Sequence, residues 1–297
     1  MEQAPDISGK VALVTGSSRG IGRAIAQRLA SAGATVIVTA RSMSQPVAMR
    51  RSGAEAVPGT LDETVELIRA AGGKAIALAA DLENPADLET LVARARDAGG
   101  RLDILVNNAG YAAYAPVAEM TLDAFDRNIT HYLRVPFALS SAAIPIFKGQ
   151  GGGWIVNIGS CTALPILRPY QDYAKAGVDT VYASVKAALH RFTQGLAAEL
   201  VDHNIAVNAV GPSTAIRTEG AAELIPEEYP TEDVAYLAET VLAMSHKPAA
   251  ERTGLVAFSM HFPYAQDIEV RSLDGKTALP RAEPPAWSHP GINAAGE

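Results

Sequence analysis

The stretch from Val11 to Gly22, VALVTGSSRGIG, constrains the fold more than any other part of the chain. It begins with a four-residue apolar run of strand length and continues into apolar residues at helical spacing, which end at Gly33. Three glycines lie between strand and helix. Gly16 permits a tight turn, Gly20 lets the backbone approach a pyrophosphate, and Gly22 lets the helix pack against the strand. Because the N-terminus of a helix attracts phosphate, the stretch predicts a dinucleotide-binding cradle.

Strand-like and helix-like segments alternate along the rest of the chain. Predicted strands cover residues 35–39, 75–79, 104–107, 154–158, 205–208 and 255–258. Predicted helices cover residues 61–71, 85–97, 122–148, 180–202 and 231–245, with Asn84 as an N-cap before Pro85 and a bend near Pro136. This order predicts an α/β fold, a doubly wound parallel sheet of the Rossmann type, with ligands at the carboxyl ends of the strands. We expect one catalytic domain over residues 1–262. A C-terminal extension over residues 263–297 would pack on the body or on a partner subunit.

Composition bounds the class of protein. The 297 residues suffice for one large domain with a full core. A formal net charge of −7, with no cluster of lysines and arginines, argues against a nucleic-acid partner. The N-terminus lacks the features of a signal peptide, and no apolar run approaches ~18 residues, so we expect no membrane span. Cys161 is the only cysteine, which excludes an intrachain disulfide and fits a cytoplasmic protein; no metal site is expected.

Tyr182 and Lys186 carry the first indication of chemistry. They are four residues apart, so they share one face of a predicted helix. A phenol has a pKa of about 10, and an ammonium beside it is expected to lower that pKa. Such a tyrosine can give a proton to a carbonyl oxygen or take one from an alcohol. The pattern is short, and taken alone a pair on a solvated helix face explains it better than a catalytic role does.

Six motifs in one order change this balance. They are TGSSRGIG at residues 15–22, DL at 81–82, NNAG at 107–110, IVNIGS at 155–160, YASVK at 182–186 and VNAVGP at 207–212. Over residues 10–260 the chain resembles the short-chain dehydrogenase/reductase family. The resemblance implies a Rossmann-type fold, a nicotinamide cofactor and hydride transfer to or from a carbonyl or alcohol. It assigns the general acid/base to Tyr182, the ribose-holding lysine to Lys186 and the substrate-orienting serine to Ser160.

The resemblance also implies the contacts of the cofactor. Asp81 would bond the adenine amine, Asn107 and Ala109 would lie near the adenosine ribose, and Ile216 and Thr218 would hold the nicotinamide carboxamide. The complete set of expected cofactor-binding residues is Gly16, Ser18, Arg19, Gly20, Ile21, Gly22, Arg41, Asp81, Leu82, Asn107, Ala109, Gly110, Tyr182, Lys186, Pro212, Ile216 and Thr218.

The end of the second predicted strand bears on the choice between NAD and NADP. An acidic residue there would accept hydrogen bonds from the ribose 2′-hydroxyl and repel a 2′-phosphate. Ala40 stands at that position, Arg41 follows, and Arg19 in the glycine turn adds a second cation. Guanidinium groups suit phosphate, so we predict NADP, with NAD as the alternative if both arginines are simply solvated.

The chain departs from the family pattern in three places. Tyr132 stands where the family has an asparagine of a proton relay, and Asn128, one turn earlier, is either a substitute or an ordinary helix residue. The segment 164–180 is longer than usual and predicts a longer loop beside the substrate pocket; Tyr170 and Tyr173 either line that pocket or lie on the surface. The family's proline-glycine after the sixth strand is Pro212-Ser213 here.

The leading interpretation is an NADP-dependent reductase of a ketone or aldehyde, or the reverse alcohol dehydrogenase. A non-catalytic NADP-binding regulatory protein and an extended-type epimerase or dehydratase are the alternatives. The partner would be a small carbonyl or alcohol, and the apolar segment 214–230 suggests a lipophilic or aromatic one, although apolar residues also simply pack. The resemblance further implies a homodimer or homotetramer that associates through the two long helices.

Overall fold

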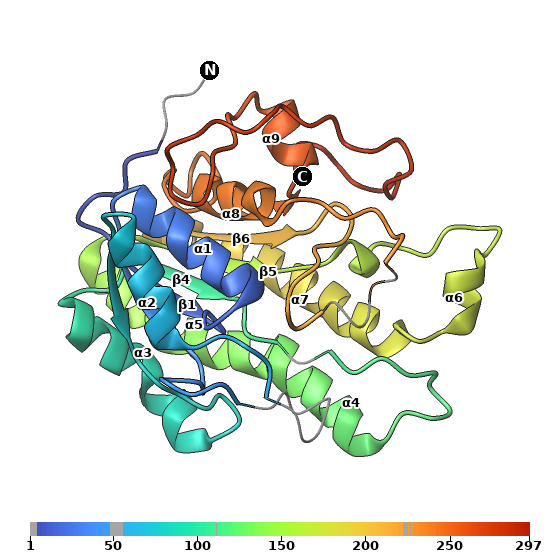
Figure 1. The fold of residues 1–297 in the computed structure, drawn as a ribbon, viewed down its shortest axis with the longest axis horizontal. Helices are drawn as coiled ribbons and strands as arrows, with labels where there is room; N and C mark the ends of the chain where they lie inside the picture. The colour runs from blue at the N-terminus through green and yellow to red at the C-terminus, as the bar shows by residue number, and fades with distance from the viewer. Residues whose placement is uncertain (1–4, 48–55, 111, 222–224, 226) are drawn as a thin grey trace.

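A parallel sheet of seven strands forms the centre of the computed structural model, which describes residues 5–47, 56–110, 112–221, 225 and 227–297 (Figure 1). Along the sheet the order is β3-β2-β1-β4-β5-β6-β7, and every neighbouring pair is parallel. This confirms the predicted doubly wound sheet. The strands are β1 (Val11–Thr15), β2 (Thr35–Thr39), β3 (Lys74–Ala77), β4 (Ile104–Asn107), β5 (Gly153–Ile158), β6 (Ile205–Gly211) and β7 (Val256–Phe258).

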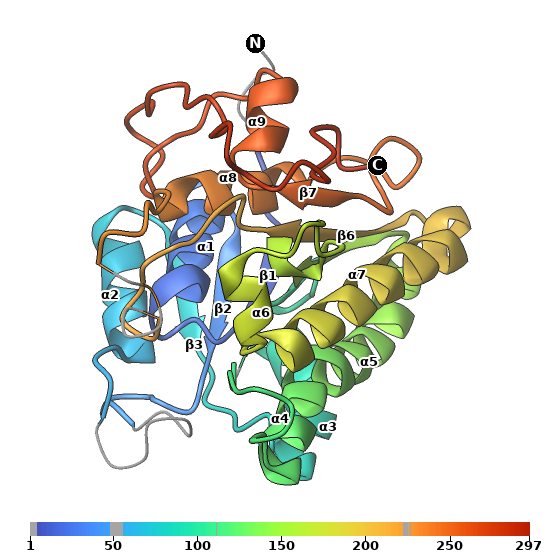
Figure 2. The ribbon, with the colours of Figure 1, turned by 90° about the vertical axis from the view of Figure 1, so that its right-hand side faces the viewer.

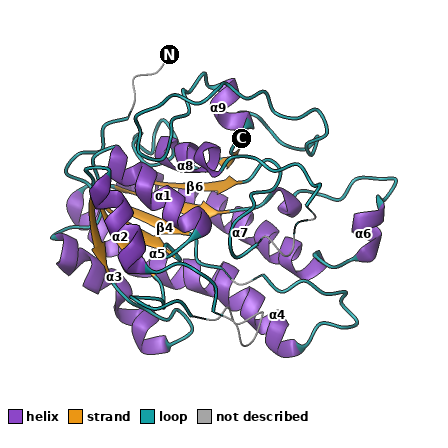
Figure 3. Ribbon diagram, in the orientation of Figure 1, coloured by secondary structure: helices purple, strands orange, loops and turns teal. Residues whose placement is uncertain are grey.

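Helices cover both faces of the sheet (Figures 2 and 3). They are α1 (Gly20–Ser31), α2 (Leu61–Ala70), α3 (Pro85–Gly99), α4 (Leu122–Ile129), α5 (Val135–Gln150), α6 (Asp172–Ala176), α7 (Thr180–Leu200), α8 (Val234–Ala243) and α9 (His261–Ala265). Successive strand residues point to opposite faces. In β1, Ala12 and Val14 therefore join the core under α1, α2 and α8, whereas Val11 and Leu13 join the core under α3, α5 and α7.

Local sequence explains where the helices begin. Thr60 and Glu63 form a reciprocal capping box at the start of α2. Asn84 caps α3 by accepting hydrogen bonds from two backbone amides, with Pro85 at the first helical position, as predicted. By contrast, no side chain caps α1. The amides of its first turn are left to bind an anion instead.

The predicted helix over residues 122–148 is interrupted. It divides into α4, a π-helical segment at Thr130–Arg134, and α5, with Pro136 in the first turn of α5. The irregular turn therefore lies just before Pro136, the residue near which the sequence predicts a bend. π-Helical turns inside α-helices are frequent at functional sites. It carries His131 and Tyr132, both buried.

The C-terminal extension, which includes most of α9, lies against the body of the same chain beside α8 (Figure 1). Gly296 accepts a hydrogen bond from the backbone amide of Val256 in β7, and the Tyr236 hydroxyl donates to the carbonyl oxygen of Pro280. A buried ion pair between Arg28 and Glu239 joins α1 to α8. The Glu239 carboxylate also accepts a hydrogen bond from the backbone amide of Arg271. None of the described helices has the length and apolar character needed to cross a membrane.

Candidate active site

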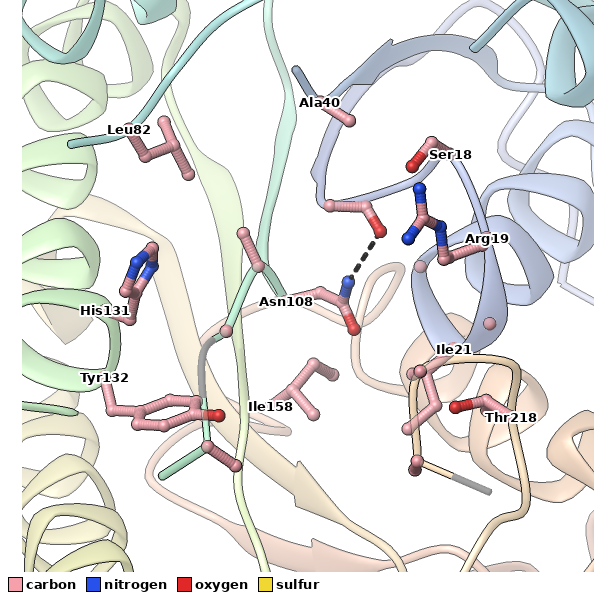
Figure 4. Close-up of a pocket in the computed structure, with 18 of the residues that line it drawn as sticks. Ser18, Arg19, Ile21, Ala40, Leu82, Asn108, His131, Tyr132, Ile158 and Thr218 are labelled. Carbon is pink, nitrogen blue, oxygen red and sulfur yellow. Dashed lines mark hydrogen bonds between the residues drawn. The ribbon is translucent and has the colours of Figure 1, made fainter. Parts of the chain in front are cut away.

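A cavity of about 390 Å³ opens at the carboxyl ends of the strands (Figure 4). In the close-up, His131 and Tyr132 lie on one wall, opposite Arg19, Ile21 and Thr218. Predicted site residues that line it are Gly16, Ser18, Arg19, Gly20, Ile21, Gly22, Arg41, Asp81, Leu82, Ala109, Gly110, Ser160, Tyr182, Lys186, Pro212 and Thr218. One cavity thus brings together segments from across the first 221 residues.

Two glycines of the turn are required by space and by backbone angle. Gly16 has φ +67°, in the left-handed region, and a side chain there would meet the backbone of Ala109 at 2.8 Å. A Cβ at Gly22 would lie 2.3 Å from the carbonyl oxygen of Gly16. Asn108 closes the turn by donating from Nδ2 to the carbonyl oxygens of Thr15, at 2.7 Å, and Gly16, at 3.3 Å (Figure 4). The result is a bare backbone concavity at the uncapped start of α1, which fits a pyrophosphate.

The two arginines predicted to recognise a 2′-phosphate lie on the rim beside Ala40. Arg19 donates from Nη2 to the carbonyl oxygen of Gly59, at 3.2 Å, and to the Ser42 hydroxyl, at 3.4 Å. Burial lowers the pKa of Arg19, while Glu219 opposes that change. Arg41 is exposed. The described residues at the end of β2 therefore present positive charge and no carboxylate.

His131 lines the cavity although the sequence did not single it out. It lies in the π-helical segment, near Leu82 (Figure 4), and its Nε2 is 2.8 Å from Glu83 Oε1. In the sequence, only its position next to Tyr132 indicates that His131 lies near the site. The other lining residues outside the predicted set are Thr39, Ala40, Ser42, Val47, Ala80, Asn108, Ala112, Tyr114, Tyr132, Ile158, Gly159, Gly220 and Ala221.

Two predicted cofactor residues point elsewhere. Asn107 is buried in the sheet, where its Nδ2 donates to Asn157 Oδ1 at 2.8 Å, and Asn108 lines the cavity in its place. Ile216 belongs to the hydrophobic core on the face of the sheet that α1, α2 and α8 cover, and it does not line the cavity. Tyr170, proposed as a possible lining residue, is exposed beneath the guanidinium of Arg168. The side chain of Tyr173 and residues 222–224 and 226 lie outside the described part of the chain.

Ser160, Tyr182 and Lys186 meet at the inner end of the cavity. Ser160 follows β5, and its hydroxyl is 2.8 Å from that of Thr162. Lys186 is buried and donates from Nζ to the carbonyl oxygen of Ile158 at 2.6 Å. The same Nζ lies 4.1 Å from the ring centre of Tyr132 and 5.7 Å from that of Tyr182. Hydroxyl, phenol and amine therefore face one volume.

Burial, more than charge, determines the protonation of this group. Burial raises the pKa of Tyr182 well above its ordinary value of 10; Tyr114 and Tyr132 add to the effect, and a hydrogen bond with Ser160 opposes it. Burial also lowers the pKa of Lys186 to about 7. We expected a lowered pKa for Tyr182 because of Lys186; the direction is wrong, because desolvation of the phenolate is the largest influence on this pKa. Tyr182 therefore holds its proton at neutral pH.

The position of the missing relay asparagine is filled by an aromatic ring. Tyr132 meets Tyr182 edge to face, with centroids 5.3 Å apart, and Tyr114 lies 5.1 Å from Tyr182 on another side. Asn128 is fully buried, donates to the carbonyl oxygens of Ala124 and Ala113, and does not line the cavity. Its side chain thus ties α4 to the preceding loop.

Fold and cavity place the chain among α/β proteins that bind dinucleotides. The sequence pattern of the short chain dehydrogenase family matches residues 10–228, and the chain belongs to that family. A protein of Methylorubrum extorquens named as an uncharacterized oxidoreductase is 37% identical over 258 residues, covering 85% of this chain and 90% of the relative. The 3-oxoacyl-(acyl-carrier-protein) reductase of Escherichia coli is 35% identical over 207 residues, covering 70% of this chain and 74% of the relative.

Solved structures agree. The crystal structure of a 3-oxoacyl-(acyl-carrier-protein) reductase from Agrobacterium tumefaciens with NADP bound matches with a TM-score of 0.70 at 28% identity, covering 85% of this chain and 93% of the other. The chain is therefore an oxidoreductase that acts on CH–OH or C=O groups with a nicotinamide cofactor. Membership of this family favours a catalytic oxidoreductase over a non-catalytic NADP-binding protein and over an epimerase or dehydratase.

Proposed function

We propose that this enzyme uses NADP to interconvert a carbonyl compound and its alcohol, with Tyr182 as the general acid/base. The observation that carries the proposal is the meeting of Ser160, Tyr182 and Lys186 in a cavity whose other end is a bare glycine turn. A bound nicotinamide would supply or accept the hydride. The expected cofactor-binding set stands as proposed, with Asn108 and His131 added and with Asn107 and Ile216 assigned supporting positions only.

The protonation states support the roles of the trio. A buried phenol that keeps its proton is suited to donate to a carbonyl oxygen as negative charge develops there. The Ser160 hydroxyl can donate a second hydrogen bond to the same oxygen. Lys186, held by the Ile158 carbonyl, presents its remaining N–H groups toward the ribose position that the family assigns to it.

NADP is proposed over NAD because Arg19 and Arg41 lie beside Ala40, where a carboxylate would favour NAD. The NADP-bound relative is consistent with this choice. Fluorescence titration with NADPH and NADH tests it, followed by turnover of a panel of ketones and aldehydes. Tighter binding of NADH, or binding of NADPH without turnover of any compound, would contradict the proposal.

Assembly, domain division and location are proposed as well. Exposed apolar side chains on α4 and α5, Leu122, Phe125 and Phe137, support association of copies through the long helices as a dimer or tetramer. The division into residues 1–262 and 263–297 is supported by the single sheet that the first part completes. Location in the cytoplasm rests on the sequence alone.

A further inference from the structure

Three consecutive residues of the C-terminal extension are linked to the two loops that follow β5 and β6: His289 and Trp287 contact them directly, and Ser288 reaches the loop after β6 through His261. The family pattern ends at residue 228, so this segment and its contacts are features of this chain beyond that pattern. The segment itself does not line the described cavity, whose lining ends at Ala221 in chain order. Any effect on the site must therefore pass through the loops.

His289 holds the loop after β5. Its Nδ1 accepts a hydrogen bond from the backbone amide of Gly291, at 3.0 Å, so the proton is on Nε2. Nε2 donates to the carbonyl oxygen of Pro165, at 3.0 Å. Pro165 lies five residues after Ser160 in the loop whose extra length departs from the family pattern. The imidazole therefore joins the C-terminal extension to the loop that follows Ser160.

Ser288 reaches the loop after β6 through a directed chain of hydrogen bonds. Its hydroxyl donates to the Pro285 carbonyl and so accepts from His261 Nε2, at 3.1 Å. His261 Nδ1 then accepts a hydrogen bond from the Ser213 hydroxyl, at 2.9 Å. Ser213 Oγ in turn accepts a hydrogen bond from the backbone amide of Met260. Burial lowers the pKa of His261 and so favours the neutral imidazole. This row of hydrogen bonds requires the neutral form, because Nδ1 has to accept. Ser213 is the residue that replaces the family's glycine, directly after Pro212 of the cavity wall.

Two further contacts complete the attachment of the loop after β6. The buried Glu232 carboxylate accepts a hydrogen bond from the Ser259 hydroxyl at 2.5 Å, and Ser259 Oγ in turn accepts one from the backbone amide of Ser213 at 2.9 Å. Trp287 packs edge to face on Tyr229, with centroids 5.9 Å apart. The beginning and the end of this loop are thus both held.

We propose that Trp287, Ser288 and His289 are positioning residues that limit the size of substrate the enzyme accepts, because they hold the two loops that border the substrate end of the cavity. The loop after β5 begins at Ser160, and the loop after β6 contributes Pro212, Thr218 and Ala221 to the lining. Holding both restricts how far they can separate. The inference rests on the proposed function for its choice of substrate, but not for the loop contacts themselves.

Hydrogen–deuterium exchange of the protein without added cofactor tests the contacts independently of any activity. We expect His289→Ala to speed exchange of the 161–171 amides, and Ser288→Ala that of the 213–218 amides, each by about fivefold, the factor that loss of one ordinary hydrogen bond gives. His289→Gln keeps a donor and restores slow exchange. His203→Ala, an exposed histidine before β6, is the matched control. Unchanged exchange in both tail variants would overturn the proposal.

Kinetics with NADPH and two ketones of different size, cyclohexanone and benzophenone, test the specificity. In Trp287→Ala and His289→Ala the ratio of kcat/KM for benzophenone over cyclohexanone should rise about tenfold, mainly through KM, while Trp287→Phe and His203→Ala keep the wild-type ratio. An equal loss of kcat for both ketones would contradict a role in size selection. If the wild type reduces no ketone or aldehyde of the panel, the proposed function fails, while the exchange result still decides whether the extension holds the loops.

Discussion

Replacing Tyr132 by leucine tests how this enzyme manages without the relay asparagine. Burial alone takes the pKa of Lys186 to about 7, and the ammonium lies 4.1 Å from the centre of the Tyr132 ring. A desolvated cation–π contact contributes about 2 kcal/mol, and about 1.4 kcal/mol corresponds to one pH unit. The ring therefore favours the charged form of Lys186, and leucine, which removes that contact, should lower the pKa of Lys186 by about one pH unit or more.

The assay is NADPH affinity measured across pH by fluorescence, with Tyr132→Phe as the matched control. If the charged lysine contributes to binding, the leucine variant should lose about fivefold in affinity near pH 7, with its pH midpoint lower by about one unit. Phenylalanine keeps the aromatic face and should keep the midpoint. Equal behaviour of the two variants, or a midpoint that moves upward in the leucine variant, would refute the reasoning.

Three further predictions address the cradle, the cofactor choice and a buried acid. Gly22→Ala places a Cβ 2.3 Å from the Gly16 carbonyl oxygen and should weaken NADPH binding at least about tenfold, whereas Gly195→Ala, which meets only the flexible end of Arg191, should leave titrations unchanged and slightly raise Tm. Arg41→Ala should weaken NADPH about tenfold and NADH little, measured by the same titration, because only the former carries the 2′-phosphate; equal losses would contradict the assignment. Burial raises the pKa of Glu232 from its ordinary value of 4.5 to about 7, so the folded state holds this proton more tightly than the unfolded chain does, and stability should fall by about 3 kcal/mol as pH rises from 4.5 to 7. Denaturant unfolding of Glu232→Gln should lack that part of the decline and show higher stability above pH 7; an unchanged pH profile would contradict it.

Much of the fold could be predicted because its signals are local. The apolar runs, the glycine turn before α1 and the Asn84–Pro85 start of α3 each depend on neighbouring residues in the chain. The six motifs likewise indicated Ser160, Tyr182 and Lys186, which the fold then brings to one cavity.

The errors come from contacts between distant segments. Asn107 and Asn108 look alike in sequence, but the last residue of β4 points toward Asn157 and only the next one turns to the cavity. The π-helical segment that turns His131 inward leaves no pattern that periodicity can detect. Charge spacing predicted a lowered pKa for Tyr182, yet burial, which no motif encodes, reverses the direction.

The hydrogen bonds that link Ser288, His261 and Ser213 could not be predicted from the sequence either. The three residues are 75 positions apart at the extremes (288 − 213), and no motif relates them. A proline-rich extension carries little periodic signal, so its role emerges only from the hydrogen bonds it makes once folded.

The most direct test of the account is carbonyl reduction by Tyr182→Phe in the presence of NADPH. We expect the variant to keep its fold and to bind NADPH within about twofold of wild type, while turnover of any carbonyl that the wild type reduces falls by at least about a hundredfold, since the general acid is lost. Turnover close to wild type with bound NADPH would contradict the assignment of Tyr182 and, with it, the proposed mechanism.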